Sequence, residues 1–192
     1  MSRIQEIVEQ CLVEMSQVEI HMMFPGDIPE EMLDPSIEPS NDSRGWKPIK
    51  SILTDDDLDK LEGKIGHPLP HSYREFLQYK HFYSLIISDR AVNFPDHLPD
   101  KEVNFLLGHV FNYMIPEKII GKGYIYFADF EDYGLLCFDT NEKRENNEYP
   151  IVYIDHEDLE DIHLYANNFL ELLEADADRG DGFVEYLNSL SA

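Results

Sequence analysis

The chain has few of the features that mark secreted or membrane-spanning proteins. Two of its 192 residues are cysteines, Cys11 and Cys137, and their apolar neighbours favour buried thiols over a disulfide or a metal pair. No apolar run approaches the roughly 18 residues that a membrane-spanning helix needs. Residues 1–14 also lack the basic start and apolar centre of a signal peptide. We therefore expect a soluble cytoplasmic protein.

Basic residues are scarce as well. Fifteen Lys and Arg stand against 39 Asp and Glu, which gives a formal net charge of −24. Such a charge repels phosphate backbones and anionic lipid surfaces, so we expect no direct binding to nucleic acid and none to membranes. The acids either serve solubility alone or complement a basic partner protein, and the composition leaves both readings open.

Motifs of the common catalytic plans are missing from the sequence. It contains no G-x-S-x-G elbow, no glycine-rich phosphate loop and no H-E-x-x-H helix. Cys137 is a candidate nucleophile, but its place in the apolar run 135–138 predicts a raised pKa and no exposure. Residues 155–163 offer carboxylates and imidazoles for a divalent cation, but without calcium-loop spacing. We expect no enzyme, cofactor or metal, and a metal-dependent hydrolase is the weakest alternative.

What the chain does contain is a series of apolar patterns in the order helices, strands, helices, which predicts an α+β fold. Helical spacing predicts an amphipathic helix over residues 3–20. The five prolines of residues 25–48 predict an extended connector rather than packed secondary structure. The predicted division is an N-terminal helix and connector, residues 1–45, followed by an α+β domain, residues 46–192.

The strongest helix signals lie between Thr54 and Leu77. Thr54 and Asp57 have the spacing of a capping box, and Gly66 suits a left-handed C-cap. Pro70 fits the first turn of a second helix, which we expect to continue to about residue 85. The remaining predicted elements are helices over residues 100–115 and 181–190, a helix capped by Asn167 or Asn168, and strands over residues 124–128, 135–139 and 150–155.

Three blocks of this sequence form a recognisable set: L-x-x-L-E-x-x-I-G-x-P-L-P-x-S-Y-x-x-F-L, then G-Y-I-Y-F-A-D with G-L-L-C-F-D, then Y-P-I-V-Y-I-D with N-F-L-E-L-L. The residues that carry the pattern are Leu61, Glu62, Ile65, Gly66, Leu69, Pro70, Tyr73, Phe76, Leu77, Phe127, Ala128, Asp129, Gly134, Phe138, Asp139, Val152, Phe169 and Leu173. In this order the blocks resemble the SUKH superfamily, specifically its Smi/Knr branch, over about residues 46–190. The chain departs from the family pattern after Leu77, where an Asn-Gly turn is absent.

The resemblance implies a central, mainly antiparallel sheet covered by helices, and a non-enzymatic binding role. Bacterial proteins of this kind are commonly immunity proteins that block toxins, and fungal relatives resemble regulators of cell-wall synthesis. The leading hypothesis is therefore an immunity protein that binds a cognate toxin domain with a basic, nucleic-acid-handling surface. The candidate contact residues are the acids of two predicted loops, Asp129, Glu131, Asp132, Asp155, Glu157, Asp158, Glu160 and Asp161.

The alternative is a regulator or scaffold that binds an endogenous partner. In that case we expect the N-terminal helix to dock the partner through its apolar face, formed by Ile4, Ile7, Leu12 and Met15.

Overall fold

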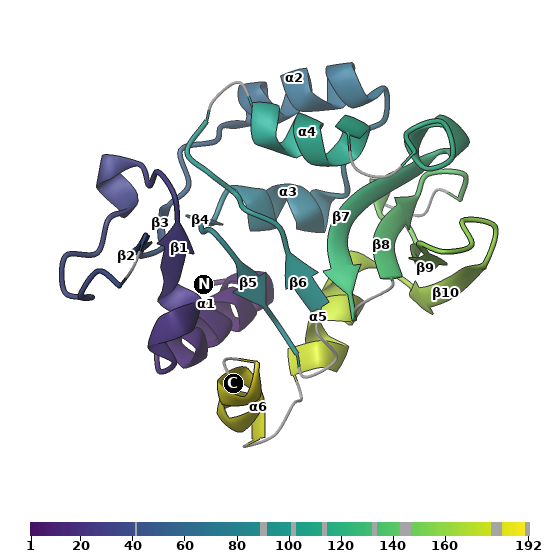
Figure 1. The fold of residues 1–192 in the computed structure, drawn as a ribbon. Coiled ribbons are helices and arrows are strands. Elements are labelled where there is room, and N and C mark those ends of the chain that lie inside the picture. Colours follow the sequence, from purple (N-terminus) through teal and green to yellow (C-terminus); the bar gives the residue numbers. More distant parts are fainter. Residues whose placement is uncertain are drawn as a thin grey trace.

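The computed structural model describes residues 1–40, 42–88, 92–100, 103–112, 115–131, 134–142, 147–177 and 182–190 (Figure 1). These residues form six α-helices and a six-stranded antiparallel sheet, so the predicted α+β fold is confirmed. The helices are α1 (Arg3–Met15), α2 (Asp55–Ile65), α3 (His71–Leu77), α4 (Asn104–Asn112), α5 (Phe169–Ala177) and α6 (Phe183–Ser189). Short 3₁₀ turns add η1 (Glu19–Met22), η2 (Glu30–Met32) and η3 (Ile120–Lys122).

The central sheet is a meander, because its strands lie side by side in chain order. They are β5 (Leu85–Ile86), β6 (Val92–Phe94), β7 (Tyr124–Phe130), β8 (Gly134–Asp139), β9 (Ile151–Asp155) and β10 (Ile162–Ala166). Two small antiparallel pairs accompany it, β1 (Met23–Pro25) with β2 (Ser43–Gly45) and β3 (Ile49–Lys50) with β4 (Lys80–His81). The strands expected over residues 124–128, 135–139 and 150–155 are thus confirmed as β7, β8 and β9.

The two faces of the sheet are covered differently. On one face an aromatic cluster joins α3, α5 and the sheet, and in it Tyr73 lies 5.2 Å from Phe169 and Phe127 lies 4.2 Å from Phe138, measured between ring centroids. On the other face a smaller buried cluster contains Tyr126, Leu135, Cys137, Val152 and Ile154 together with Ile119 and Leu159 from loops. Helices therefore bury the first face, and connecting loops close the second.

The capping signals around α2 have the predicted geometry. The Thr54 side chain accepts the Asp57 amide, and the Asp57 carboxylate accepts the Thr54 amide at 3.0 Å. Gly66 ends the helix with φ of 84°, where a glycine avoids the steric cost of a left-handed residue. Pro70 stands at the N-cap of α3 rather than inside its first turn. These local rules fix the two helices that frame the site described below.

Helix α1 differs from expectation in its length and in its partner. It ends at Met15 rather than near residue 20, because Ser16 and the following turn break the pattern before η1. Its apolar residues, including the four expected to dock a partner (Ile4, Ile7, Leu12 and Met15), are buried in the main core, and the helix contacts α3, α5 and α6. The predicted docking face is wrong, since this face already packs inside the chain.

The segment between α1 and α2 is also packed rather than extended. It contains β1, η2 and β2, and it buries Ile28, Met32 and Trp46 in the main core. Backbone bonds hold it, from the Trp46 amide to the Met22 carbonyl and from the Lys47 amide to the Met32 carbonyl, both at 2.8 Å. The prediction of an unpacked connector is wrong, because these apolar side chains outweigh the proline signal. The division at residue 45 remains a prediction.

The continuation of the second helix to residue 85 is wrong. α3 ends at Leu77, and the chain instead forms β4 and β5, where His81 pairs with Ile49 and Leu85 pairs with Phe94. The expected helix over residues 100–115 is present as the shorter α4. Asn168 caps α5 by accepting the Glu171 amide at 2.9 Å, which confirms one of the two predicted caps. The strand β10 was not expected.

Candidate partner-binding site

Three of the predicted contact acids lie together at one end of the sheet. Glu131 follows β7 and Asp155 ends β9, and the register of β8 brings these ends close through its pairing of Gly134 with Asp155. Burial raises the pKa of Tyr153, and the nearby charges of Asp155, Glu131 and Asp161 raise it further. The structure therefore gathers Glu131, Asp155 and Asp161 around one tyrosine.

Other predicted acids serve the loop that carries them. The Asp155 carboxylate accepts the Glu157 amide at 2.7 Å, and the Asp158 carboxylate accepts the Glu160 amide at 3.2 Å. In turns, an Asp side chain commonly accepts a hydrogen bond from the backbone amide two residues later in the chain. Asp155 and Asp158 therefore shape the loop between β9 and β10, while Glu157 stands exposed on it.

The remaining acids differ in how far they are paired. Glu160 forms an ion pair with Lys122 at 2.7 Å, which lowers the pKa of the carboxyl group. Asp161 lies 2.7 Å from the His163 ring, and Asp129 accepts the Tyr126 hydroxyl at 2.9 Å. Asp132 lies outside the described residues. The eight predicted residues therefore do not form one uniform acidic surface.

The two candidate sites of chemistry have clear structural settings. The Cys137 thiol is fully buried within the sheet, and burial raises its pKa, as its apolar neighbours predict. Within the described residues, no group of three or more His, Cys, Asp or Glu is placed to hold a metal ion. In the region from Asp155 to His163, several carboxylates instead bond to backbone amides, to Lys122 or to His163.

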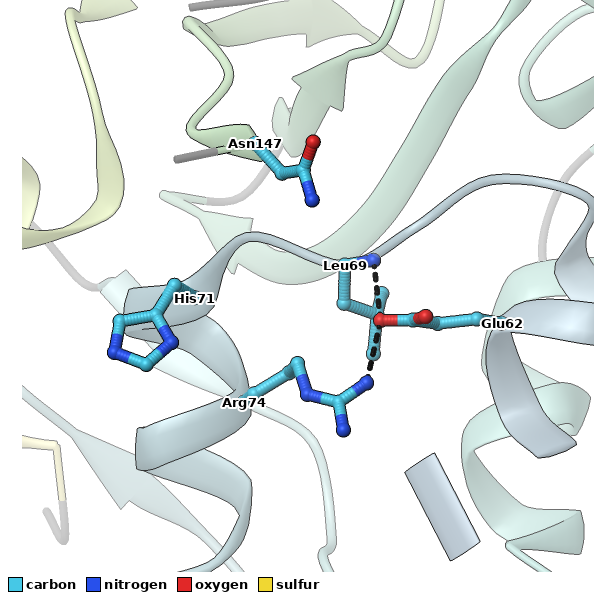
Figure 2. A pocket seen from close by; sticks show the side chains of 5 residues that line it. All are labelled: Glu62, Leu69, His71, Arg74 and Asn147. Atoms are coloured by element: carbon cyan, nitrogen blue, oxygen red, sulfur yellow. Dashed lines mark hydrogen bonds and ion pairs between the residues drawn. The ribbon is translucent and has the colours of Figure 1, made fainter. Parts of the chain in front are cut away.

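A hollow that the sequence did not reveal opens beside α2 and α3 (Figure 2). Its volume is about 520 Å³, and we call it the α2–α3 pocket. Glu62 of α2, Leu69 of the connecting turn, His71 and Arg74 of α3, and Asn147 line it. Figure 2 shows the Glu62 and Arg74 side chains meeting beside Leu69, with Asn147 on another wall. Charged and apolar groups thus share one concave surface.

Arg74 is the anchor of the α2–α3 pocket. Its Nη1 donates to Glu62 at 2.8 Å and to Asp59 at 2.9 Å, and its Nη2 donates to the Asp55 carboxylate at 3.1 Å. Burial acts to lower the pKa of the guanidinium, but the bonds to the three carboxylates outweigh it and raise that pKa. Arg74 therefore joins α3 to one face of α2.

The wall opposite Arg74 is held by neighbours of Asn147. The Glu148 carboxylate accepts the Ser72 amide at 2.9 Å and the Ser72 hydroxyl at 2.7 Å, so this segment is tied to the start of α3. Asn147 itself has φ of 57°, a left-handed conformation that asparagine tolerates better than most residues. Tyr149 follows as a fully buried residue, and burial together with the Glu62 charge raises the pKa of its hydroxyl.

None of these lining residues was among the predicted contacts, although the sequence holds a usable signal. Asp55, Asp59 and Glu62 recur at the i, i+4 and i+7 spacing that places side chains on one helix face. Arg74 of α3 and Gln78, the C-cap of that helix, are four residues apart, and both donate to Asp55. An acidic stripe facing a basic and an amide residue could have indicated this contact.

Comparison with protein-family models gives a match to the SMI1 / KNR4 family (SUKH-1) over residues 52–175. The match covers more than half of the chain. The chain belongs to this family. The SUKH-1 match contains α2, α3, the strands β7 to β9 and most of α5, so among the described residues it includes all those that line the α2–α3 pocket. A search of curated proteins found no match.

Membership of SUKH-1 confirms the resemblance seen in the sequence blocks, and it supports an immunity-like or regulatory binding role. SUKH proteins are generally non-catalytic binding proteins. Within the described part of the chain, no helix combines the length and the apolar character needed to cross a bilayer.

Proposed function

We propose that this SUKH-1 chain is a non-catalytic immunity-type protein, which binds and neutralises a cognate toxin domain in the cytoplasm. The family match carries the proposal, because it supports an immunity-like or regulatory binding role in a family of generally non-catalytic proteins. The formal charge of −24 indicates the sign of the partner. A toxin that handles nucleic acid presents a basic surface, and an acidic protein can cover that surface.

The acidic character acts mainly on encounter and selectivity. Complementary charge speeds association at low salt and disfavours acidic partners, whereas exposed charges contribute less to the final affinity. The exposed acids Glu131, Glu157, Asp158, Glu160 and Asp161 are the proposed steering residues, and Asp129, Asp132 and Asp155 complete the proposed surface. Neither a nucleic acid nor a membrane is the proposed ligand.

Co-expression with the products of neighbouring reading frames tests the proposal. A catalytically inactivated toxin domain should copurify with this chain, and the active domain should stop growth only when the chain is absent. The association rate should fall at least about tenfold when ionic strength rises from low salt to about 0.5 M. The absence of any complex and of any rescue would contradict the immunity role, whereas a salt-independent rate would contradict the role of charge alone.

The regulatory alternative also agrees with the family and predicts a different partner. An endogenous partner should copurify from the native host when no neighbouring toxin gene is expressed. Deletion of residues 1–45 does not distinguish the two roles, because it would strip buried side chains such as Met15 and Met32 from the core. Growth rescue and copurification, measured on the full chain, separate them.

A further inference from the structure

We propose that the α2–α3 pocket receives a lysine or arginine side chain of the partner protein. This inference rests on the proposed binding function and deepens it, because it names a specific anchoring contact. The pocket lies on elements that belong to the family match, away from the β9–β10 loop that carries most of the predicted contact acids. Its own charges decide which ligand it takes.

Carboxylates outnumber the guanidinium on the α2 side of the pocket. One guanidinium, Arg74, faces three carboxylates, those of Glu62, which lines the pocket, and of Asp55 and Asp59 beside it. The Arg74 donors are committed to these carboxylates and to the Asp55 carbonyl, so few remain for an incoming phosphate or carboxylate group. An anionic ligand would therefore meet the Glu62 charge with only the His71 ring and the Asn147 amide as further donors, whereas a cation would meet a carboxylate that can still accept.

Glu62 supplies the acceptor that a cation needs. Its Oε1 accepts both the Leu69 amide at 2.9 Å and Arg74 Nη1 at 2.8 Å. No donor among the described residues bonds to Oε2, although only 20% of the side chain is exposed. A half-used carboxylate, held in place by a backbone amide and an arginine, is pre-oriented to accept a further charged donor.

The rest of the lining suits the remainder of such a side chain. Leu69 offers apolar surface to the methylene stem, which lysine and arginine bury while the head group stays polar. Asn147 adds a side-chain amide on another wall, drawn in Figure 2 with its nitrogen toward Leu69. Rotation of this amide would offer its oxygen as a second acceptor. A volume of about 520 Å³ admits one long side chain with part of its backbone. The set matches one basic residue better than a bare metal ion, which prefers several carboxylates.

Titration with small blocked amino acids tests the pocket without the partner. In ¹⁵N NMR spectra of the full chain, N-acetyl-lysinamide and N-acetyl-argininamide should shift the amide signals of Leu69, Arg74 and Asn147, whereas N-acetyl-glutamine amide should not. Glu62→Gln should weaken this binding at least about fivefold, because it removes the charge and keeps an oxygen for the Leu69 amide. Shifts confined to the exposed loop of Glu157, or shifts unchanged in Glu62→Gln, would overturn the inference.

A second variant guards against a folding defect. Asn147→Gly keeps the left-handed backbone accessible and removes only the amide side chain, so it should fold normally and weaken the same probes. Glu38→Gln is the matched control, since it removes one exposed acid that belongs neither to the pocket nor to the proposed steering surface. Far-UV circular dichroism and thermal melting establish the fold of each variant before titration.

The toxin complex gives an independent reading. Glu62→Gln should lower partner affinity at least about tenfold, as expected for loss of one side of a desolvated charge pair, while the control Glu38→Gln should change it less than about twofold. A complex whose affinity is the same in both variants would overturn the pocket and leave the proposed function intact. If the wild-type chain forms no complex, the proposed function fails, and the small-molecule titration alone decides the pocket.

Discussion

Acidification should destabilise this protein through two histidines that are buried as neutral rings. The His81 Nε2 atom accepts the Ile52 amide at 3.0 Å, while Nδ1 lies 3.1 Å from the His97 carbonyl oxygen. The His97 Nδ1 atom in turn lies 2.8 Å from the Lys80 carbonyl oxygen. A proton on His81 Nε2 would point at an N–H donor, so the geometry favours the neutral form.

The pKa values of the two rings follow from this setting. Burial lowers the pKa of His81 to about 4, against smaller opposing effects of the His97 carbonyl bond and the Glu31 charge. Burial and the neighbouring His81 lower the pKa of His97 to about 3. In the unfolded chain a histidine titrates near pH 6.5, so the unfolded state takes up protons first as the pH falls.

The sign and size of the effect follow from proton linkage. The stability contributed by the two neutral rings is fully present above about pH 6.5 and is lost as the pH falls toward the folded pKa values. At about pH 5 the unfolded histidines are almost fully charged, while the folded rings are almost neutral. Each histidine then lowers the free energy of unfolding by about 2 kcal/mol relative to neutral pH. This is a large share of a typical stability of about 5–15 kcal/mol.

Urea unfolding followed by circular dichroism at about pH 7.5, 6 and 5 measures this loss. We expect the free energy of unfolding to fall by about 2–4 kcal/mol over that range. The loss should shrink by about half in His81→Gln, whose side-chain oxygen can still accept the Ile52 amide, and should persist in the exposed-site control His163→Gln. A loss below about 1 kcal/mol in the wild type, or an equal loss in His81→Gln, would refute the reasoning.

Three further predictions concern the framework of the site. A double-mutant cycle on Arg74→Gln and Glu62→Gln, measured by urea unfolding, should give a coupling energy of about 1–2 kcal/mol. The reason is that only 17% of the Arg74 side chain and 20% of the Glu62 side chain are exposed. A coupling energy near zero would contradict a structural role of this ion pair. Gly134→Ala should lower the melting temperature by several degrees, since its Cβ would overlap the Tyr153 ring, and an unchanged value would contradict this close approach. Gly63→Ala, exposed inside α2 with no atom within 4 Å of the new Cβ, should instead stabilise the chain by about 0.5–1 kcal/mol, and any loss of stability would argue against an open helical site there.

The elements that the sequence predicted well are those whose ends obey local chemistry. α2 begins and ends where Thr54 and Gly66 indicate, and α5 begins at the Asn168 cap. The strands β7 to β9 are long enough for their β-branched and aromatic residues to indicate a strand clearly. In these places a few neighbouring residues determine the backbone. The prediction therefore needed no knowledge of distant contacts.

The elements that were missed depend on residues outside their own segment. β4 and β5 are two residues each, and they exist because Ile49 and Phe94 supply their partners. Short apolar runs such as residues 81–87 carry no readable period, so helix and strand cannot be separated locally. Likewise α1 has the expected apolar stripe, but only the folded chain shows that α5 and α6, more than a hundred residues later, bury it.

Charge shows most clearly why a candidate site could not be chosen from residue types alone. The loop between β9 and β10 is rich in acids. However, the carboxylates of Asp155 and Asp158 accept hydrogen bonds from backbone amides of the same loop, and Glu160 forms an ion pair with Lys122. The sequence cannot separate an acid that builds a turn from one that is offered to a partner, because both occupy polar loops.

What separates them is the state of each carboxylate oxygen in the folded chain. An exposed acid is screened by salt and gains little from one more ion pair, so it influences encounter more than affinity. Glu62 is different, because two donors hold one of its oxygens in a mostly buried position and leave the other to the pocket. A carboxylate fixed in this way has already paid the ordering entropy that an exposed side chain loses on binding. We therefore propose that the anchoring contact lies at α2 and α3 and that the acidic loops act in the approach to it.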